Sequence, residues 1–289
     1  MASTTGRSYT NLIIGSFLLL IAVITFFPFY YVIVASFSDA NLLREGHLLL
    51  LPQGFSLSAY KMIFSNQRFV NCFNVSVLRT VLGLIINLTL QCMVAYPLSR
   101  KYLPGRKYFT LYIIFAMLFN GGIIPTYLIV KQTGLLDTIF ALVIPGAIST
   151  WNVIILRSFF ENIPESLEES AKIDGANDVY IFIKIILPLS KPVIMTIGLF
   201  IAVHHWNAFM DAVIYVTSSK LQVLQLYLRD MVVYMEKASL LGDGTMSSDV
   251  SSISLRTATI FTSTLPIIII YPFIQKHFIK GVMIGAIKG

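Results

Sequence analysis

The sequence has little charge and almost no cysteine. Only 12% of its 289 residues are charged, about half of the ~25% that is typical of soluble domains. Its two cysteines, Cys72 and Cys92, would be about 30 Å apart on one continuous helix, which is too far for a disulfide. They indicate neither a redox framework nor a metal site. The scarcity of charge argues against an ordinary soluble protein.

Catalytic motifs are also missing. The chain has no GxxxxGK[ST] phosphate loop, so ATP hydrolysis is not assigned to it. It has no HExxH, CxxC or GxSxG pattern either. His204 and His205 are adjacent, and on a helix they would point about 100° apart, which makes them a poor metal-binding pair. We therefore expect no catalytic residue, no resident cofactor and no metal site.

Long apolar runs are what the chain does contain. Hydrophobic residues make up 56% of it, and a run of about 20 apolar residues is long enough to cross a bilayer as a helix. A helix also satisfies its own backbone hydrogen bonds in lipid. The first run is too long for a cleaved signal peptide. We predict an all-α membrane protein, with residues 1–289 forming one transmembrane domain. The six predicted transmembrane helices are residues 12–37, 74–98 (with Arg79 near its start), 108–130, 138–156, 192–210 and 257–275.

The positive charges indicate how the chain is oriented. The formal net charge is +7, but the basic residues lie between apolar runs and form no single stripe, so we do not expect nucleic acid as a partner. The link 100–107 carries four cations and no acid, which predicts that it lies on the cytoplasmic side. Both termini, and the link between the fourth and fifth runs, then also lie in the cytoplasm.

The cytoplasmic link over residues 161–188 has the pattern of a short acidic helix. Pro164 suits a first helical position, Glu165 and Glu168 favour the positive end of the helix dipole, and Gly175 suits a helix stop. A helix that lies on lipid headgroups usually carries Lys and Arg on its polar face. Because this helix is mainly acidic, we expect its partner to be a protein.

This segment carries a family resemblance. Glu169-Ser170-Ala171 is followed after three residues by Gly175, and after nine more by Ile185-Ile186-Leu187-Pro188. The spacing resembles the "EAA…G…I-x-LP" signature of binding-protein-dependent ABC transporter permeases, with Ser170 where the signature usually has alanine. The resemblance covers nearly the whole chain. It is strongest to carbohydrate permeases of the maltose-transporter class, in particular to the group that imports complex oligosaccharides.

The resemblance implies a mechanical role for the segment. In this family it is a coupling helix, which docks in a groove of the ATP-hydrolysing subunit and moves with it. The positions carried over for ATPase coupling are Glu168, Glu169, Ser170, Ala171, Asp174 and Gly175. The implied partners are a second, related permease subunit, two ATP-binding subunits that hold ATP and Mg, and an extracytoplasmic solute-binding protein. The implied location is the bacterial inner membrane.

Polar residues within the predicted spans are candidates for the substrate path. Aromatic rings stack on sugar faces and amides bridge sugar hydroxyls, and polar groups at membrane depth usually face a bundle interior or a watered cavity. Hydrogen bonding between helices and interfacial anchoring of tryptophan explain the same residues equally well, so both interpretations stay open. The candidates are Asn120, Trp151, Asn152, His205, Trp206 and Asn207.

The long outer loop before the last span is a second candidate contact region. By the resemblance it approaches the solute-binding protein, and a simple solvated loop is the other interpretation. Its central residues are Gly242, Asp243, Gly244 and Thr245. Basic residues on outer loops are compatible with an acidic cargo, so alginate- or pectin-derived oligosaccharides are included among the expected substrates. The alternative function is an ion-coupled secondary transporter, which would need ionisable relay residues that the spans hardly contain.

Overall fold

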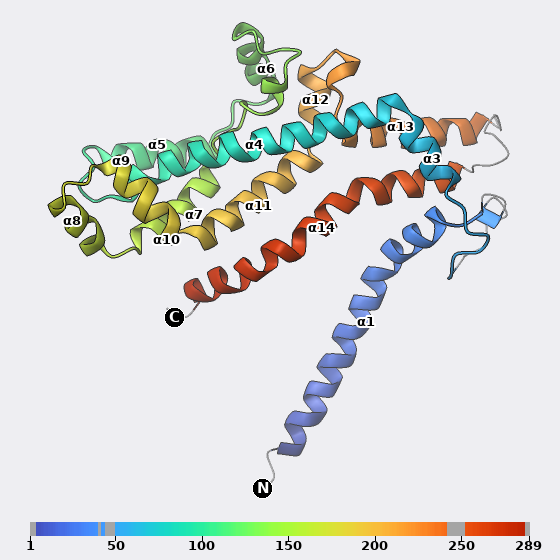
Figure 1. Cartoon of the computed structure of the whole chain (residues 1–289), viewed down its shortest axis with the longest axis horizontal. Coiled ribbons are helices and arrows are strands. Elements are labelled where there is room, and N and C mark those ends of the chain that lie inside the picture. The colour runs from blue at the N-terminus through green and yellow to red at the C-terminus, as the bar shows by residue number, and fades with distance from the viewer. Residues whose placement is uncertain (1–3, 40–41, 44–49, 242–251, 287–289) are drawn as a thin grey trace. The chain divides into compact units, whose positions relative to one another are not determined.

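The computed structural model describes residues 4–39, 42–43, 50–241 and 252–286, and within these ranges the regular elements are all helices (Figure 1). The chain divides into two compact units. The first comprises Met1–Val70 with Leu228–Leu265, and the second comprises Asn71–Tyr227 with Pro266–Gly289.

The first unit contains the long amino-terminal helix and a small aromatic cluster. Its elements are α1 (Thr4–Ser36), α3 (Ser58–Ser65), most of α13 (Leu224–Leu241) and the first part of α14 (Ser252–Ala286). Apolar side chains of α1 between Leu12 and Phe29 are exposed, which suits a helix surrounded by lipid tails. The ring of Phe37 stacks on that of Tyr60 with centroids 5.0 Å apart. The Tyr60 hydroxyl donates to Ser36 Oγ at 2.7 Å, which ties α3 to the end of α1.

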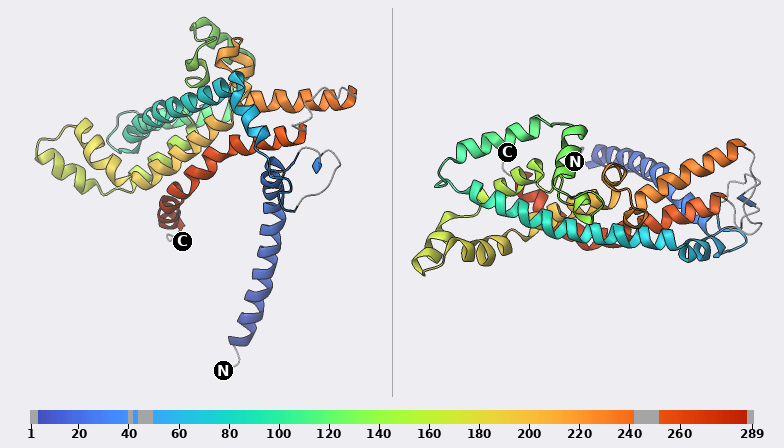
Figure 2. Two further views of the ribbon diagram at one scale, coloured as in Figure 1. Left: turned by 45° about the vertical axis from the view of Figure 1, so that its right-hand side comes forward. Right: turned by 90° about the horizontal axis from the view of Figure 1, so that it is seen from above.

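The second unit contains most of the helices and the larger core. Its elements are α4 (Gln67–Ser99, from residue 71), α5 (Arg106–Leu118), α6 (Ile123–Gln132), the 3₁₀ turn η1 (Ile139–Leu142), α7 (Thr150–Glu161), α8 (Glu165–Ile173), α9 (Asp178–Ile181), the π-helical turn η2 (Phe182–Ile186), α10 (Leu187–Leu189), α11 (Lys191–Asn207), α12 (Met210–Tyr215) and the 3₁₀ turn η3 (Ser219–Leu221). Helices α4 and α11 lie side by side in the views of Figures 1 and 2. Ala95, Leu156, Phe160 and Ile197 are fully buried in one cluster, which joins α4, α7 and α11.

Three of the predicted spans coincide with single helices that are long and apolar enough to cross a membrane, at Asn11–Ser36, Gln67–Ser99 and Ile253–Ile270. The third predicted run is broken, because α5 and α6 meet at an angle of 115°. Gly122, at the start of α6, has φ +87°, a conformation that continues no helix. The fifth run corresponds to α11, which bends by 83° from the segment Asp178–Leu189.

The fourth predicted span, residues 138–156, is not one helix, so that prediction is wrong. The structure has the four-residue turn η1 there and then begins α7 at Thr150. Pro145 precedes Gly146, which has φ +81°, and Ser149 caps α7 by accepting from the Asn152 amide. These turn residues outweigh the apolar composition. In the described part of the chain, three helices are long and apolar enough to span, or up to five if each bent pair is one span.

Candidate functional site: the coupling segment

The signature residues form a short helix that ends in a glycine turn. Helix α8 has Glu165 and Glu168 in its first turn and Lys172 in its last, which matches the helix dipole at both ends. Gly175 has φ +84° and donates its amide to the Lys172 carbonyl at 3.0 Å. A Cβ at Gly175 would meet nothing within 4 Å. The glycine is therefore required for its backbone conformation and not for space around it.

The rest of the signature leads directly into the helix that follows. Asn177 caps α9, because its side chain accepts from the Tyr180 amide at 2.8 Å. The chain then passes through η2 and α10 to α11; α10 and α11 are labelled in Figure 1. Pro188 lacks an N–H and cannot donate to the preceding turn, and the π-helical turn stands just before it. Short, consecutive helical pieces thus connect α8 to α11.

Glu168 is directed inward, away from the exposed face of α8. Its carboxylate lies 2.5 Å from the Arg100 guanidinium, and the two side chains are only 6% and 5% exposed. Arg100 also lies over the ring of Tyr96, 4.9 Å from its centroid, and that ring stacks on Phe182 at 4.9 Å. Burial raises the pKa of Glu168, while the nearby charge of Arg100 opposes this rise. The pair connects the end of α4 with α8 and η2.

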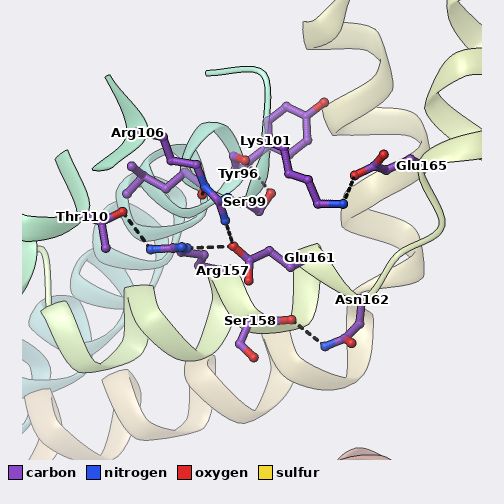
Figure 3. Close-up of polar contacts among 11 residues, drawn as sticks. Tyr96, Ser99, Lys101, Arg106, Thr110, Arg157, Ser158, Glu161, Asn162 and Glu165 are labelled. Atoms are coloured by element: carbon purple, nitrogen blue, oxygen red, sulfur yellow. Dashed lines mark hydrogen bonds and ion pairs between the residues drawn. The ribbon is translucent and has the colours of Figure 1, made fainter. Parts of the chain in front are cut away.

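Exposed ion pairs surround this buried one. Lys101 pairs with Glu165 at 3.0 Å (Figure 3), and Lys172 pairs with Asp178 at 3.0 Å. Lys172 Nζ also lies over the ring of Tyr102, 4.6 Å from its centroid. The Lys101 and Glu165 side chains are 79% and 59% exposed, so this pair contributes at most about 1 kcal/mol. Of these pairs, only Glu168–Arg100 is shielded from solvent.

A second polar network attaches the end of α7 to the same loop. Glu161 accepts from Arg157 Nε at 2.9 Å and from Arg106 (Figure 3). Arg106 Nε donates to the Leu98 carbonyl at 2.8 Å, and Arg157 donates to Thr110 Oγ1 at 2.9 Å. The link 100–107, whose cations predict the orientation of the chain, therefore also holds α7 and α8 in place.

The predicted coupling residues fall on two sides of α8. Glu169, Ser170, Asp174 and Gly175 are exposed, and Ala171 is half-buried against the core cluster. Glu168 alone of the predicted set is buried. Exposed apolar side chains extend the outer face: Leu167 is 43% exposed, Ile173 87%, Val179 65% and Tyr180 54%. The outer face is therefore acidic, small and apolar, which suits a protein partner.

Sequence reasoning missed Arg100 as a partner of this segment, because it treated the residue only as a marker of orientation. Arg79 was likewise noted only as a charge near the start of a span. It is 1% exposed, forms an ion pair with Asp211, and donates to the Ala208 carbonyl at 2.9 Å. The signal available for both pairs was opposite charge on segments expected on the same side or end of the bundle.

The predicted substrate-path residues do not form one group in the described part of the chain. Asn120 is exposed and accepts from the Gly122 amide, and Asn207 is exposed and donates to the Val203 carbonyl. Both hydrogen bonds are local. Trp151 is 60% exposed, whereas its neighbour Asn152 is buried.

His205 and Trp206 are occupied by contacts inside the second unit. The His205 ring lies 2.8 Å from the Asn87 amide nitrogen, and the Trp206 ring meets Phe73 edge-on at 5.9 Å. These contacts favour packing roles. The predicted binding-protein contacts, Gly242, Asp243, Gly244 and Thr245, lie outside the described residues.

The amino-acid sequence of the chain is similar to those of known transport permeases. Residues 93–284 match the family described as binding-protein-dependent transport system inner membrane component. The chain is 45% identical over 288 residues to the polygalacturonan/rhamnogalacturonan transport system permease protein YtcP of Bacillus subtilis (strain 168), covering 98% of this chain and 99% of that one. It is 43% identical over 269 residues to protein LplC of the same organism, covering 93% and 91%.

Solved structures show the same relationship. The chain is 32% identical, with a TM-score of 0.87, to a chain in the crystal structure of a bacterial ABC transporter involved in the import of the acidic polysaccharide alginate, covering 96% of this chain and 99% of that one. A second chain, from the alginate transporter in complex with an alginate pentasaccharide-bound periplasmic protein, is 15% identical with a TM-score of 0.56 and shares the fold. The chain belongs to the family of binding-protein-dependent transport system inner membrane components.

Proposed function

We propose that this chain is the permease subunit of an ATP-driven importer of acidic oligosaccharides, and that α8 is its contact with a separate ATPase subunit. The proposal rests mainly on the composition of the outer face of α8 and of the turn after it. There, exposed acidic and small side chains lie beside exposed apolar ones, of which Ile173 is 87% exposed. A surface of this kind needs a protein to cover it.

The expected mechanism is rigid-body transmission. When the ATPase subunits bind ATP and close, they displace α8, and the short helices after it pass this displacement to α11. Packed helices have discrete arrangements, so a small displacement at one end switches the bundle between two states. ATP can shift the equilibrium between these two states only by the difference in its binding free energy for them. In this scheme ATP and Mg are held by the partner subunits.

The proposed assembly contains this chain, a second related permease subunit, two ATP-binding subunits and an extracytoplasmic solute-binding protein. The cationic link 100–107 supports placing α8 and both termini in the cytoplasm. The exposed apolar surface of α1 supports contact with lipid in the inner membrane.

The proposed cargo is an oligosaccharide rich in uronic acids. One similar protein is named for a polygalacturonan/rhamnogalacturonan transport system, and another belongs to a transporter involved in the import of the acidic polysaccharide alginate. Within the chain, Trp151 and Asn207 are exposed and suit sugar stacking and hydrogen bonding. His205 and Trp206, which are held by Asn87 and Phe73, suit a role in shaping the path.

Transport by the complete assembly tests this function against the ion-coupled alternative. Proteoliposomes would carry ATP on the side of α8 and receive labelled oligogalacturonate with its binding protein on the other. We expect uptake that requires both ATP and the loaded binding protein and that persists when a protonophore dissipates the proton gradient. Uptake without ATP that follows an ion gradient would establish the secondary transporter instead.

A further inference from the structure

Glu168 and Arg100 form a charge pair that solvent barely reaches. Their side chains are 6% and 5% exposed, and their charged groups are 2.5 Å apart. The Nε of Arg100 has no hydrogen-bond partner among the described residues. The pair and the ring of Tyr96 are therefore the described contacts that balance the guanidinium charge. Removing one member of such a pair leaves an uncompensated charge in the interior.

The pair joins two helices that are distant along the chain. Glu168 is on α8, and Arg100 directly follows the last residue of α4, with its amide bonded to the Pro97 carbonyl at 3.0 Å. Tyr96 of α4 contacts both Arg100 and Phe182 of the π-helical turn. Apart from the covalent path through α9 to α11, α8 thus has a direct and buried connection to α4.

The orientation of Glu168 argues against direct contact with a motor protein. A partner docked on the exposed face of α8 would meet Glu169, whereas Glu168, about 100° further around the helix, is buried. A residue so placed acts on the partner only through the position of the helix that carries it.

We propose that Glu168 is a positioning residue, whose buried pair with Arg100 fastens the coupling helix to the end of α4, so that displacement of α8 reaches α4 as well as α11. This inference rests on the proposed function, because it assumes that α8 is the element the ATPase displaces. It separates Glu168 from Glu169, Ser170, Asp174 and Gly175, which remain the proposed contact residues.

The test uses the complete transporter with three variants: Arg100→Met, Glu168→Leu and the double variant. Each single change leaves one buried charge alone, and we expect ATP hydrolysis stimulated by loaded binding protein to fall at least about tenfold. The double variant replaces the pair by two apolar groups that still pack, and we expect it to return to within about threefold of the wild type. Lys101→Met is the matched control, since its pair is exposed, and we expect less than about a twofold change.

A second readout distinguishes positioning from general loss of structure. A spin label at Ser166→Cys, on the exposed surface of α8, is expected to be immobile in the wild type and in the double variant, and mobile in both single variants. The ATPase subunits are expected to co-purify with all four proteins. Glu168→Gln keeps the side-chain volume, so it provides a folded variant if Glu168→Leu does not accumulate, with an intermediate loss of stimulation and intermediate mobility expected.

Two outcomes would overturn the proposal. In the first, the double variant stays as inactive as the single ones although its label is immobile, which would mean that the motor uses the charge of Glu168 itself. In the second, Arg100→Met or Glu168→Gln retains full stimulation with a mobile label. Failure of the wild-type chain to co-purify with any ATPase would instead contradict the proposed function, so the two failures are distinguishable.

Discussion

Gly175→Val is expected to abolish the stimulation of ATP hydrolysis by loaded binding protein, whereas Gly175→Asn is expected to retain most of it. Gly175 has φ +84°, a conformation that costs a residue with a Cβ about 1–2 kcal/mol and is least accessible to β-branched residues. Asparagine tolerates this region better than other non-glycine residues. The turn fixes how α8 leads into α9, so a changed turn would move the outer face of α8 away from the proposed ATPase partner.

The paired variants separate backbone strain from steric clash within the chain. A Cβ at Gly175 has open space around it, so both substitutions fit locally and differ mainly in their backbone preference. The measurement is ATP hydrolysis of the assembled transporter with and without loaded binding protein, with membrane insertion of each variant as the control. Equal activity of the valine and asparagine variants would show that the left-handed turn is not needed for coupling.

Asp211→Asn is expected to destabilise the second unit strongly. It leaves the guanidinium of Arg79, which is 1% exposed and has no hydrogen-bond partner at Nε among the described residues, without a counter-charge. The expected loss is about 3–5 kcal/mol of unfolding free energy. Arg79→Met should cost less, because the Asp211 side chain it leaves is 26% exposed and can be hydrated.

Denaturant unfolding of the purified chain in detergent measures these differences. The double variant Arg79→Met/Asp211→Asn is expected to be more stable than Asp211→Asn alone, because it removes the unpaired charge. Asp230→Asn is the matched control in the first unit: it breaks the Arg68–Asp230 pair, whose side chains are 50% and 46% exposed, and should cost at most about 1 kcal/mol. A smaller loss for Asp211→Asn than for Asp230→Asn would contradict the role of the buried pair.

Local sequence patterns were sufficient to predict the short helix α8. The boundaries of α8 follow from Pro164, the acids of the first turn and Gly175, all of which act within a few residues of their own position. Three predicted runs coincide with α1, α4 and α14. These helices could be predicted because an uninterrupted apolar stretch of sufficient length is a local property of the sequence.

Predictions that depended on neighbours distant in sequence did less well. His205 was a candidate for the substrate path, yet it is buried against α4 at a place where an added Cβ on Gly83 would lie 2.3 Å from its ring. Only a glycine at position 83 allows the His205 ring to lie this close to the backbone of α4. The hydrophobic periodicity of α4 or of α11 does not predict this contact. The pair of Arg100 with Glu168 also joins residues that are distant in sequence. The break at Gly146 within residues 138–156 was a local signal that apolar composition concealed.

The account depends most on α8 meeting a separate ATPase on the cytoplasmic side. Cysteine cross-linking from Ile173→Cys, at a position that is 87% exposed, tests this directly, since the native Cys72 and Cys92 are buried. In membranes that contain the complete transporter, we predict a cross-linked product that includes the ATP-hydrolysing subunit, and protection of Ile173→Cys from an impermeant thiol reagent added outside. Capture of no ATPase, or labelling of this cysteine from the external side, would contradict the account.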